Sequence, residues 1–225
     1  MDADHTPKSP SKLHVYIDFD RTLFDTPKFG DDLNHLIAVH ARVSPAQARM
    51  DAAPFYTHAT LRSFDFEGYV AAYGLSPDTM LEHVRQLVHA NNYLYDDSVQ
   101  FIEALQTSGF TPKILSFGED RFQRAKIIPT FTHLLGSDNA DYGDSASLET
   151  YVILEPKGQH IALKHPSERG VLVDDIPDQQ LPPGFSEIHL MRGSTLKQPQ
   201  STASGFTISD LAQAYAAIMQ LVSQS

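Results

Sequence analysis

"HVYIDFDRTLFDT", residues 14–26, begins as an apolar, β-branched run and then places two aspartates two positions apart. The apolar residues from 13 to 19 predict a buried strand. Because alternate residues of a strand point to the same side, we expect Asp18 and Asp20 to face the same way, with Thr22 two positions further on. Two interpretations are open: a strand end followed by a helix cap, or a site for a cation and a phosphoryl group.

The next stretch, residues 27–109, has helical periodicity and no strand-like run. The Ser-Pro pairs at 44–45 and 76–77 are typical of a helix N-cap followed by a proline in the first turn. A last helix is predicted to begin at Asp96 or Asp97. We therefore expect this whole segment to be helical.

After residue 109 the pattern changes to short apolar strands that alternate with helical stretches. Such alternation predicts a parallel sheet. The predicted strands are 113–117, 151–154, 170–173 and 187–191, and the predicted helices are 121–128, 158–165 and 209–222. The expected fold class is α/β: a Rossmann-like parallel sheet core built from 12–26 and 110–225, with an α-helical cap domain, 27–109, inserted after the first strand.

Composition excludes several classes of function. The 225 residues contain no cysteine, so disulfides, thiolate zinc sites and a cysteine nucleophile are excluded. The formal charge of −11 argues against nucleic acid and membrane surfaces as partners, although a small anion could bind locally. Residues 1–11 are polar, predict a disordered leader and do not resemble a secretory signal. No later stretch is apolar enough to span a bilayer, so a cytoplasmic protein is expected.

Chemically reactive side chains follow three of the predicted strands. Asp18 and Asp20 follow the first, Ser116 closes the second, and Asp174 and Asp175 follow "VLV". A further candidate, Lys157, stands about one helix before the third group. Each has an ordinary structural explanation as a turn, a cap or a surface charge. In open parallel sheets, however, the loops beyond the strand ends carry the chemistry, and the joint order favours a single site.

If these loops converge, Asp18, Asp174 and Asp175 repel one another unless Lys157 or a cation compensates. Magnesium suits a site with few carboxylates, because it keeps several waters and binds a substrate phosphate. Asp18 could then attack phosphorus, and Asp20 could give a proton to the leaving oxygen and later take one from water. A phosphoryl oxygen would accept a hydrogen bond from Ser116.

These motifs resemble those of the haloacid dehalogenase-like (HAD) hydrolase superfamily. "DFDRT" looks like its first motif, "KILSFG" its second, Lys157 its third and "VLVDD" its fourth, in the same order. The resemblance covers the chain after residue 11, because one group of members carries a helical cap between the first and second motifs. Residues 27–109 fit that cap.

The resemblance implies a nucleophile at Asp18, an acid/base at Asp20 and Mg²⁺ as cofactor. Magnesium would be held by the Asp18 side chain, the Asp20 main-chain carbonyl and the acids of the fourth motif. It also implies contacts to phosphate, from these residues: Thr22, Ser116, Phe117, Gly118 and Lys157. The choice of metal ligand among Asp174, Asp175 and Asp178 stays open, with Asp175 favoured and Asp174 second. Arg21 departs from the family pattern, which most often has glycine there, and a position with positive φ would disfavour it.

The acid at position 20 favours phosphate esters over carbon–halogen bonds, because a departing halide needs no proton. The expected function is a magnesium-dependent phosphatase acting on a small phosphorylated metabolite. A phosphotransferase or mutase with the same aspartyl-phosphate intermediate is one alternative, and a non-catalytic binding protein on the same fold is the other. A two-component receiver domain is disfavoured, because its acidic pair follows the first strand. The specific substrate and the oligomeric state are not predicted.

Overall fold

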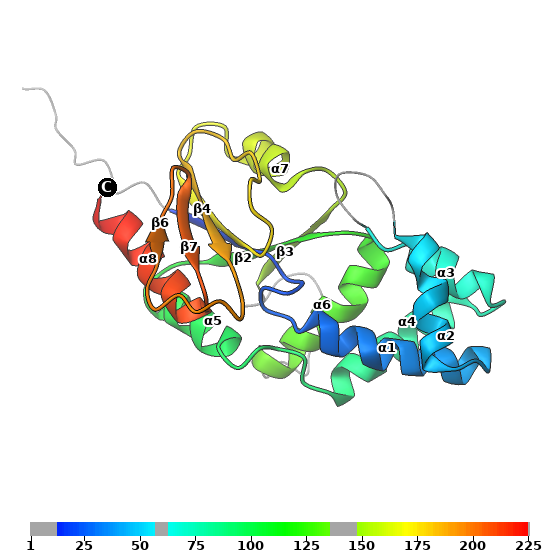
Figure 1. Ribbon diagram of the computed structural model, residues 1–225. Helices are drawn as coiled ribbons and strands as arrows, with labels where there is room; N and C mark the ends of the chain where they lie inside the picture. The colour runs from blue at the N-terminus through cyan, green and yellow to red at the C-terminus, as the bar shows by residue number, and fades with distance from the viewer. Residues whose placement is uncertain (1–12, 57–62, 136–147, 225) are drawn as a thin grey trace, which may run out of the picture.

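A mostly parallel sheet with helices on both faces forms one part of the molecule, and a mainly helical part lies beside it (Figure 1). The computed structural model describes residues 13–56, 63–135 and 148–224, with side chains up to 132 in the second range. The predicted leader at 1–11 lies outside the described residues. The strands within the described ranges are β1 (His14–Ile17), β2 (Pro112–Phe117), β3 (Glu149–Ile153), β4 (Gly170–Asp174), β5 (Phe185–Leu190), β6 (Gln200–Ser201) and β7 (Gly205–Ile208).

Between β1 and β2 the described chain contains helices. The helices of the described chain are α1 (Thr26–Ala41), α2 (Pro45–Ala52), the 3₁₀ helix η1 (Ala53–Phe55), α3 (Phe66–Ala72), α4 (Pro77–Ala90), α5 (Ser98–Thr107), α6 (Asp120–Leu135), α7 (Lys157–Lys164) and α8 (Leu211–Ser223). The predicted Ser-Pro starts of α2 and α4 are confirmed, since Ser44 and Ser76 accept hydrogen bonds from the amides of Gln47 and Thr79.

The strand order is β3-β2-β1-β4-β5-β7-β6, and only the pairing of β6 with β7 is antiparallel. The chain runs outward from β1 through β2 to β3 and then crosses to β4 on the other side of β1. The order therefore reverses between β1 and β4. Ligands bind at such a switch point, beyond the carboxyl ends of the strands.

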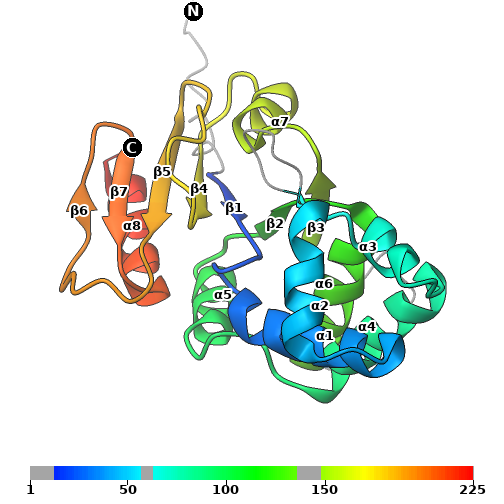
Figure 2. The same cartoon turned by 45° about the vertical axis from the view of Figure 1, so that its right-hand side comes forward.

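Alternate residues of the central strands bury opposite faces of the sheet. Tyr16 and Leu172 pack with Ile161 of α7 on one face. Ile17 and Val173 belong to the larger core on the other face, which includes the buried residues of α5, α6 and α8. Figures 1 and 2 show α7 on the opposite side of the sheet from α5. Burial on both faces explains why these strands are continuously apolar in sequence.

The helices α1 to α4 pack as a group against α6 (Figure 2). Phe66 of α3 stacks on Phe122 of α6, with ring centroids 4.5 Å apart. Arg121 of α6 also forms ion pairs with Glu67 and Asp78, which belong to this group. The stacked rings and the ion pairs join the group to α6, which follows the strand that carries Ser116.

Three details differ from the sequence prediction. The helix predicted at 121–128 continues to residue 135 through Pro129, which removes one backbone hydrogen bond. Phe131, two residues beyond the proline, is buried in the core. The short strands β6 and β7 were not predicted. The predicted cap Asp97 gives no side-chain hydrogen bond to its own helix; its carboxylate instead accepts bonds from Arg192 and from the amide of Leu211.

Arg21 has a left-handed backbone, with φ of 61°. A non-glycine residue pays a steric penalty there, so Arg21→Gly is expected to raise the free energy of unfolding by up to about 1 kcal/mol. Urea denaturation at pH 7 measures the change. Arg42→Gly, at the left-handed C-cap of α1 with φ of 58°, is the matched comparison and should move the same way. If Arg21→Gly lost stability while Arg42→Gly gained it, contacts of the Arg21 side chain would contribute more to the free energy of unfolding than its backbone strain removes.

Candidate active site

The acids from the two ends of the sequence meet at the switch point of the sheet. Asp18 follows β1, and its amide donates to the carbonyl of Val173 at 2.9 Å. Asp174 ends the neighbouring strand β4 and is completely buried, whereas Asp175 is half-buried. One ligand oxygen from each of Asp18, Asp174 and Asp175 lies within 4.8 Å of the others. The predicted convergence of the first and fourth motifs is therefore present.

Lys157 lies between two of these acids. Its Nζ donates to Asp18 Oδ1 at 2.5 Å and to Asp174 Oδ2 at 2.7 Å, and the lysine is buried. Lys157 opens α7, and Gly158 allows this helix start to approach the loop after β4: a Cβ at 158 would lie 2.1 Å from the carbonyl oxygen of Gln179. The close approach of the start of α7 to the loop after β4 thus positions the ammonium group of Lys157.

Gly158→Ala tests this positioning. The added methyl group meets backbone atoms rather than a flexible side chain, so the start of α7 must shift. We expect a loss of about 2 kcal/mol in the free energy of unfolding, together with a loss of activity as Lys157 moves. Gly30→Ala in α1 is the control, because its Cβ would meet nothing within 4 Å and helical alanine is favourable. Equal stability of the two variants would contradict the role of Gly158.

The site carries more negative charge than Lys157 can balance. Burial holds the pKa of Asp18 well above its ordinary value, with Asp174 and Asp175 acting in the same direction and Lys157 opposing them. Burial and Asp174 likewise raise the pKa of Asp175 to about 6. The two pKa values are raised because three buried carboxylates lie around a single ammonium group, which makes ionisation unfavourable.

The donor set fits a hard divalent cation. Each carboxylate oxygen of Asp174 already accepts one hydrogen bond: Oδ2 accepts from Lys157, and Oδ1 accepts from the amide of Ile176 at 2.9 Å. Asp18 Oδ2 and the Asp175 carboxylate accept no hydrogen bond from the described residues. Magnesium prefers such a sparse set of carboxylate oxygens completed by water and phosphate. Asp178 is exposed and lies outside this group of acids.

Two buried hydroxyls at the strand ends have no partner among the described residues: Oγ1 of Thr22 and Oγ of Ser116. Buried hydroxyls normally form hydrogen bonds, so these two indicate room for an acceptor that the chain itself does not supply. Both are predicted contacts to phosphate, which offers such acceptors. Two further predicted contacts already have hydrogen-bond partners for their backbone groups: the Gly118 amide donates to the carbonyl of Ile153 at 3.0 Å, and the Phe117 carbonyl accepts from Gln123 at 2.9 Å.

Asp20 lies apart from the three clustered acids and has its own buried partner. Lys126 Nζ donates to both carboxylate oxygens, at 2.7 and 2.8 Å, and Thr26 and Gln123 donate at 2.8 and 3.0 Å. Burial acts to raise the pKa of Asp20, but Lys126 outweighs it and the pKa is lowered. Asp20 is therefore held as a carboxylate ion in this arrangement.

The ammonium of Lys126 is enclosed by aromatic rings. The lysine is 3% exposed, and ring centroids of four phenylalanines lie 5.2–5.8 Å from its Nζ: Phe19, Phe24, Phe29 and Phe122. Sequence reasoning missed this residue, since a lysine in a helix is usually a surface charge. One signal was present: Gln123 and Lys126 are three positions apart, so they share one face of α6.

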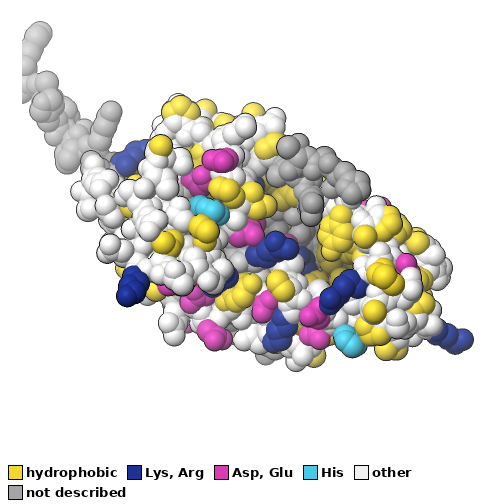
Figure 3. All heavy atoms as spheres, in the orientation of Figure 1, with side chains coloured by type: hydrophobic (Ala, Val, Ile, Leu, Met, Phe, Trp, Pro, Cys, Tyr) yellow, Lys and Arg dark blue, Asp and Glu magenta, His cyan; other side chains and the backbone are white. Residues whose placement is uncertain are grey.

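Charged side chains gather on the face of the molecule shown in Figure 3. Acidic and basic groups lie together near its middle, between the part that contains the sheet and the mainly helical part. A small charged ligand would meet both signs of charge there.

No family model and no curated protein sequence matches this chain. Solved structures do. A haloacid dehalogenase-like hydrolase of Burkholderia xenovorans has a TM-score of 0.64 at 14% identity, over 94% of this chain and 98% of that one. A HAD hydrolase of Bacillus subtilis bound to magnesium has a TM-score of 0.55 at 14% identity, with 92% and 98% covered. A HAD phosphatase of Thermococcus onnurineus has a TM-score of 0.55 at 14% identity, with 92% and 97% covered.

The chain thus has the fold of the haloacid dehalogenase-like hydrolases, an α/β fold around a largely parallel sheet. Solved dehalogenases are also among the similar structures. In the part of the chain that the structure describes, no helix combines the length and the hydropathy needed to cross a membrane.

Proposed function

We propose that this protein is a magnesium-dependent phosphatase that hydrolyses a small phosphorylated metabolite through an aspartyl-phosphate intermediate at Asp18. The observation that carries the proposal is Lys157, buried between Asp18 and Asp174 beside Asp175. The four HAD motifs in sequence order and the shared fold support it. In this proposal residues 27–109, apart from α5, which packs against α8 and β2 of the core, form a cap that closes over the substrate and excludes water.

The reaction begins with attack of an Asp18 carboxylate oxygen on phosphorus. The bond from phosphorus to the leaving oxygen breaks, and that oxygen takes a proton from Asp20, which for this half must carry a proton despite its ion pair with Lys126. Lys157 fixes the orientation of Asp18 and offsets the negative charge of the site. Thr22 and Ser116 donate their free hydroxyls to the phosphoryl oxygens.

The second half of the reaction returns the enzyme to its starting state. Water attacks phosphorus and gives its proton to Asp20, the bond to Asp18 breaks, and inorganic phosphate leaves. The ion pair with Lys126 suits this half, because it keeps Asp20 ionised and able to accept a proton. A bound Mg²⁺ would be held by Asp18, Asp175 and Asp174 and the Asp20 main-chain carbonyl, and would supply electrostatic stabilisation of the phosphoryl oxygens.

A phosphotransferase or mutase would use the same residues with another acceptor in place of water. A non-catalytic protein would need none of the free donors at this site. Dehalogenation would need neither three clustered acids nor a proton from Asp20, so the arrangement favours phosphate chemistry over it.

A phosphate-release screen over a panel of phosphorylated metabolites tests the proposal. At least one compound should release inorganic phosphate in Mg²⁺, EDTA should stop the release, and excess Mg²⁺ should restore it. Transfer to an added alcohol or sugar phosphate without release would indicate the phosphotransferase instead. Activity that is unchanged in EDTA would contradict the metal, and no turnover of any compound would favour the binding protein.

A further inference from the structure

A second group of metal-ligating side chains lies near the amino-terminal end of β1, opposite the strand ends that carry the candidate active site. His14 is the first residue of β1, His165 follows α7, and Glu168 lies in the connection from α7 to β4. Asp18 is four residues along the chain from His14, about 13 Å at the rise of a strand. The group is therefore separate from the candidate active site and takes no part in the proposed reaction.

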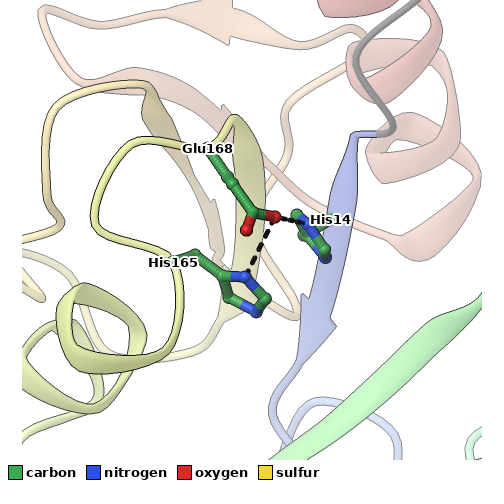
Figure 4. Close-up of side chains that lie close together, drawn as sticks. All are labelled: His14, His165 and Glu168. Atoms are coloured by element: carbon green, nitrogen blue, oxygen red, sulfur yellow. Dashed lines mark hydrogen bonds and ion pairs between the residues drawn. The ribbon is translucent and has the colours of Figure 1, made fainter. Parts of the chain in front are cut away.

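The three side chains point toward one another (Figure 4). His14 Nε2 and His165 Nδ1 both approach the same oxygen, Oε2 of Glu168, the second at 3.1 Å. The three donor atoms lie within 4.8 Å of one another although His14 is more than 150 positions from the other two. Two imidazole nitrogens and a carboxylate oxygen thus face one common point.

Neighbouring groups fix the two imidazoles. Nε2 of His165, the nitrogen that faces away from Glu168, is 2.8 Å from the hydroxyl of buried Tyr16. The rings of His14 and His165 stack, with centroids 3.9 Å apart and an angle of 29° between their planes. A hydrogen bond to the far nitrogen of a ligating histidine sets its tautomer and orientation. In a metal-bound form Nε2 would donate its proton to the Tyr16 hydroxyl, which would leave the Nδ1 lone pair facing the group.

The solvent exposure of the three side chains also suits a bound metal ion. The His14 and His165 side chains are 16% and 11% exposed, so the protein surrounds the nitrogen side. The Glu168 side chain is 51% exposed, which leaves an open position for water. Zinc takes four ligands, so water would complete the three that the protein offers.

We propose that His14, His165 and Glu168 bind a divalent transition metal, with Zn²⁺ as the best fit. Imidazole and carboxylate donors suit Zn²⁺, whereas Mg²⁺ prefers oxygen alone. The metal would tie the connection between α7 and β4 to the start of β1. These elements carry Lys157, Asp174 and Asp18 at their other ends, so the metal would act as a structural clamp on the core that bears the active site.

Titration calorimetry with Zn²⁺, in excess Mg²⁺ that keeps the active-site acids occupied, tests the proposal. The wild type should bind one equivalent of Zn²⁺ at this site and unfold at a higher temperature with it. Glu168→Gln removes a ligand at an exposed position, so the fold should survive; the affinity for Zn²⁺ should fall at least about tenfold. His35→Ala, an exposed histidine of α1, is the matched control and should bind as the wild type does.

His14→Ala provides an independent check, because it removes a nitrogen donor and leaves the contact between His165 and Tyr16. Its affinity for Zn²⁺ should fall as in Glu168→Gln. The visible absorption bands that Co²⁺ gives with the wild type should be absent from both variants. The proposal is overturned if the wild type binds no Zn²⁺, if Glu168→Gln and His14→Ala bind as tightly as the wild type, or if His35→Ala loses as much affinity. None of these outcomes depends on phosphatase activity.

Discussion

Asp18→Asn should remove phosphate release from every substrate, by at least about a thousandfold, while the protein stays folded. The amide cannot act as the anionic nucleophile. The fold should survive, because the substitution removes one of three crowded carboxylates and Lys157 keeps its bond to Asp174. In EDTA the variant is expected to be at least as stable as the wild type, since relief of repulsion offsets the lost ion pair.

The rate of phosphate release and the free energy of unfolding in EDTA together check this prediction. Asp178→Asn makes the same chemical change at an exposed acid outside the cluster and should leave both quantities unchanged. If Asp18→Asn retained turnover, the nucleophile would lie elsewhere. If it were inactive but unfolded, its inactivity would say nothing about chemistry, and a circular dichroism spectrum distinguishes that case.

Lys126→Met should have the second large effect, on both stability and chemistry. Methionine fills the phenylalanine cage but leaves Asp20 without its cation, and breaking a buried pair from one side costs about 3 kcal/mol. Because the pair lowers the folded-state pKa of Asp20, its stabilisation is present at neutral pH and is lost as the pH falls through that lowered value. The difference between wild type and variant should therefore be largest near pH 7 and shrink under acid conditions.

Urea denaturation across this pH range measures the stability difference. Lys164→Met, at an exposed position of α7, is the control and should show little change at any pH. The double variant Lys126→Met with Asp20→Asn should recover part of the lost stability, because no unpaired charge remains. A difference that does not depend on pH would show that Lys126 contributes packing alone.

The same variant tests Asp20 as the acid and base. Without Lys126 the pKa of Asp20 rises. The rate of alkyl phosphate hydrolysis should therefore begin to fall at a higher pH than in the wild type. Asp20→Asn removes the proton donor, so its rates should fall by about 10²–10³ for poor leaving groups and by less for good ones, since only the former need the proton. Equal losses across a leaving-group series, with an unshifted pH profile, would deny Asp20 this role.

The central strands, the helical stretch after β1 and the order of the motifs could be read from the sequence, because hydrophobic periodicity and capping residues are local signals. The apolar run at 13–19 and the Ser-Pro starts of α2 and α4 are examples. The parallel sheet followed from the alternation of strands and helices, and it predicted that Asp18 and Asp174 would meet. Neither β6 nor β7 was predicted, since a strand of two residues and one of four at the edge of a sheet have little pattern of their own.

Other features depend on which distant segments pack together, and no local pattern encodes them. Lys126 resembles a surface lysine until α6 packs beside the segment that follows β1, where four phenylalanines surround its ammonium group and Asp20 becomes its counterion. Arg21 has a left-handed backbone in a turn where its amide donates to the carbonyl of Phe24 and to the hydroxyl of Thr26. His14 and Glu168 are likewise 154 positions apart and meet only because β1 pairs with β4. Periodicity along the chain therefore determines the elements, whereas burial and electrostatic pairing between segments remote in sequence determine the charges at the site.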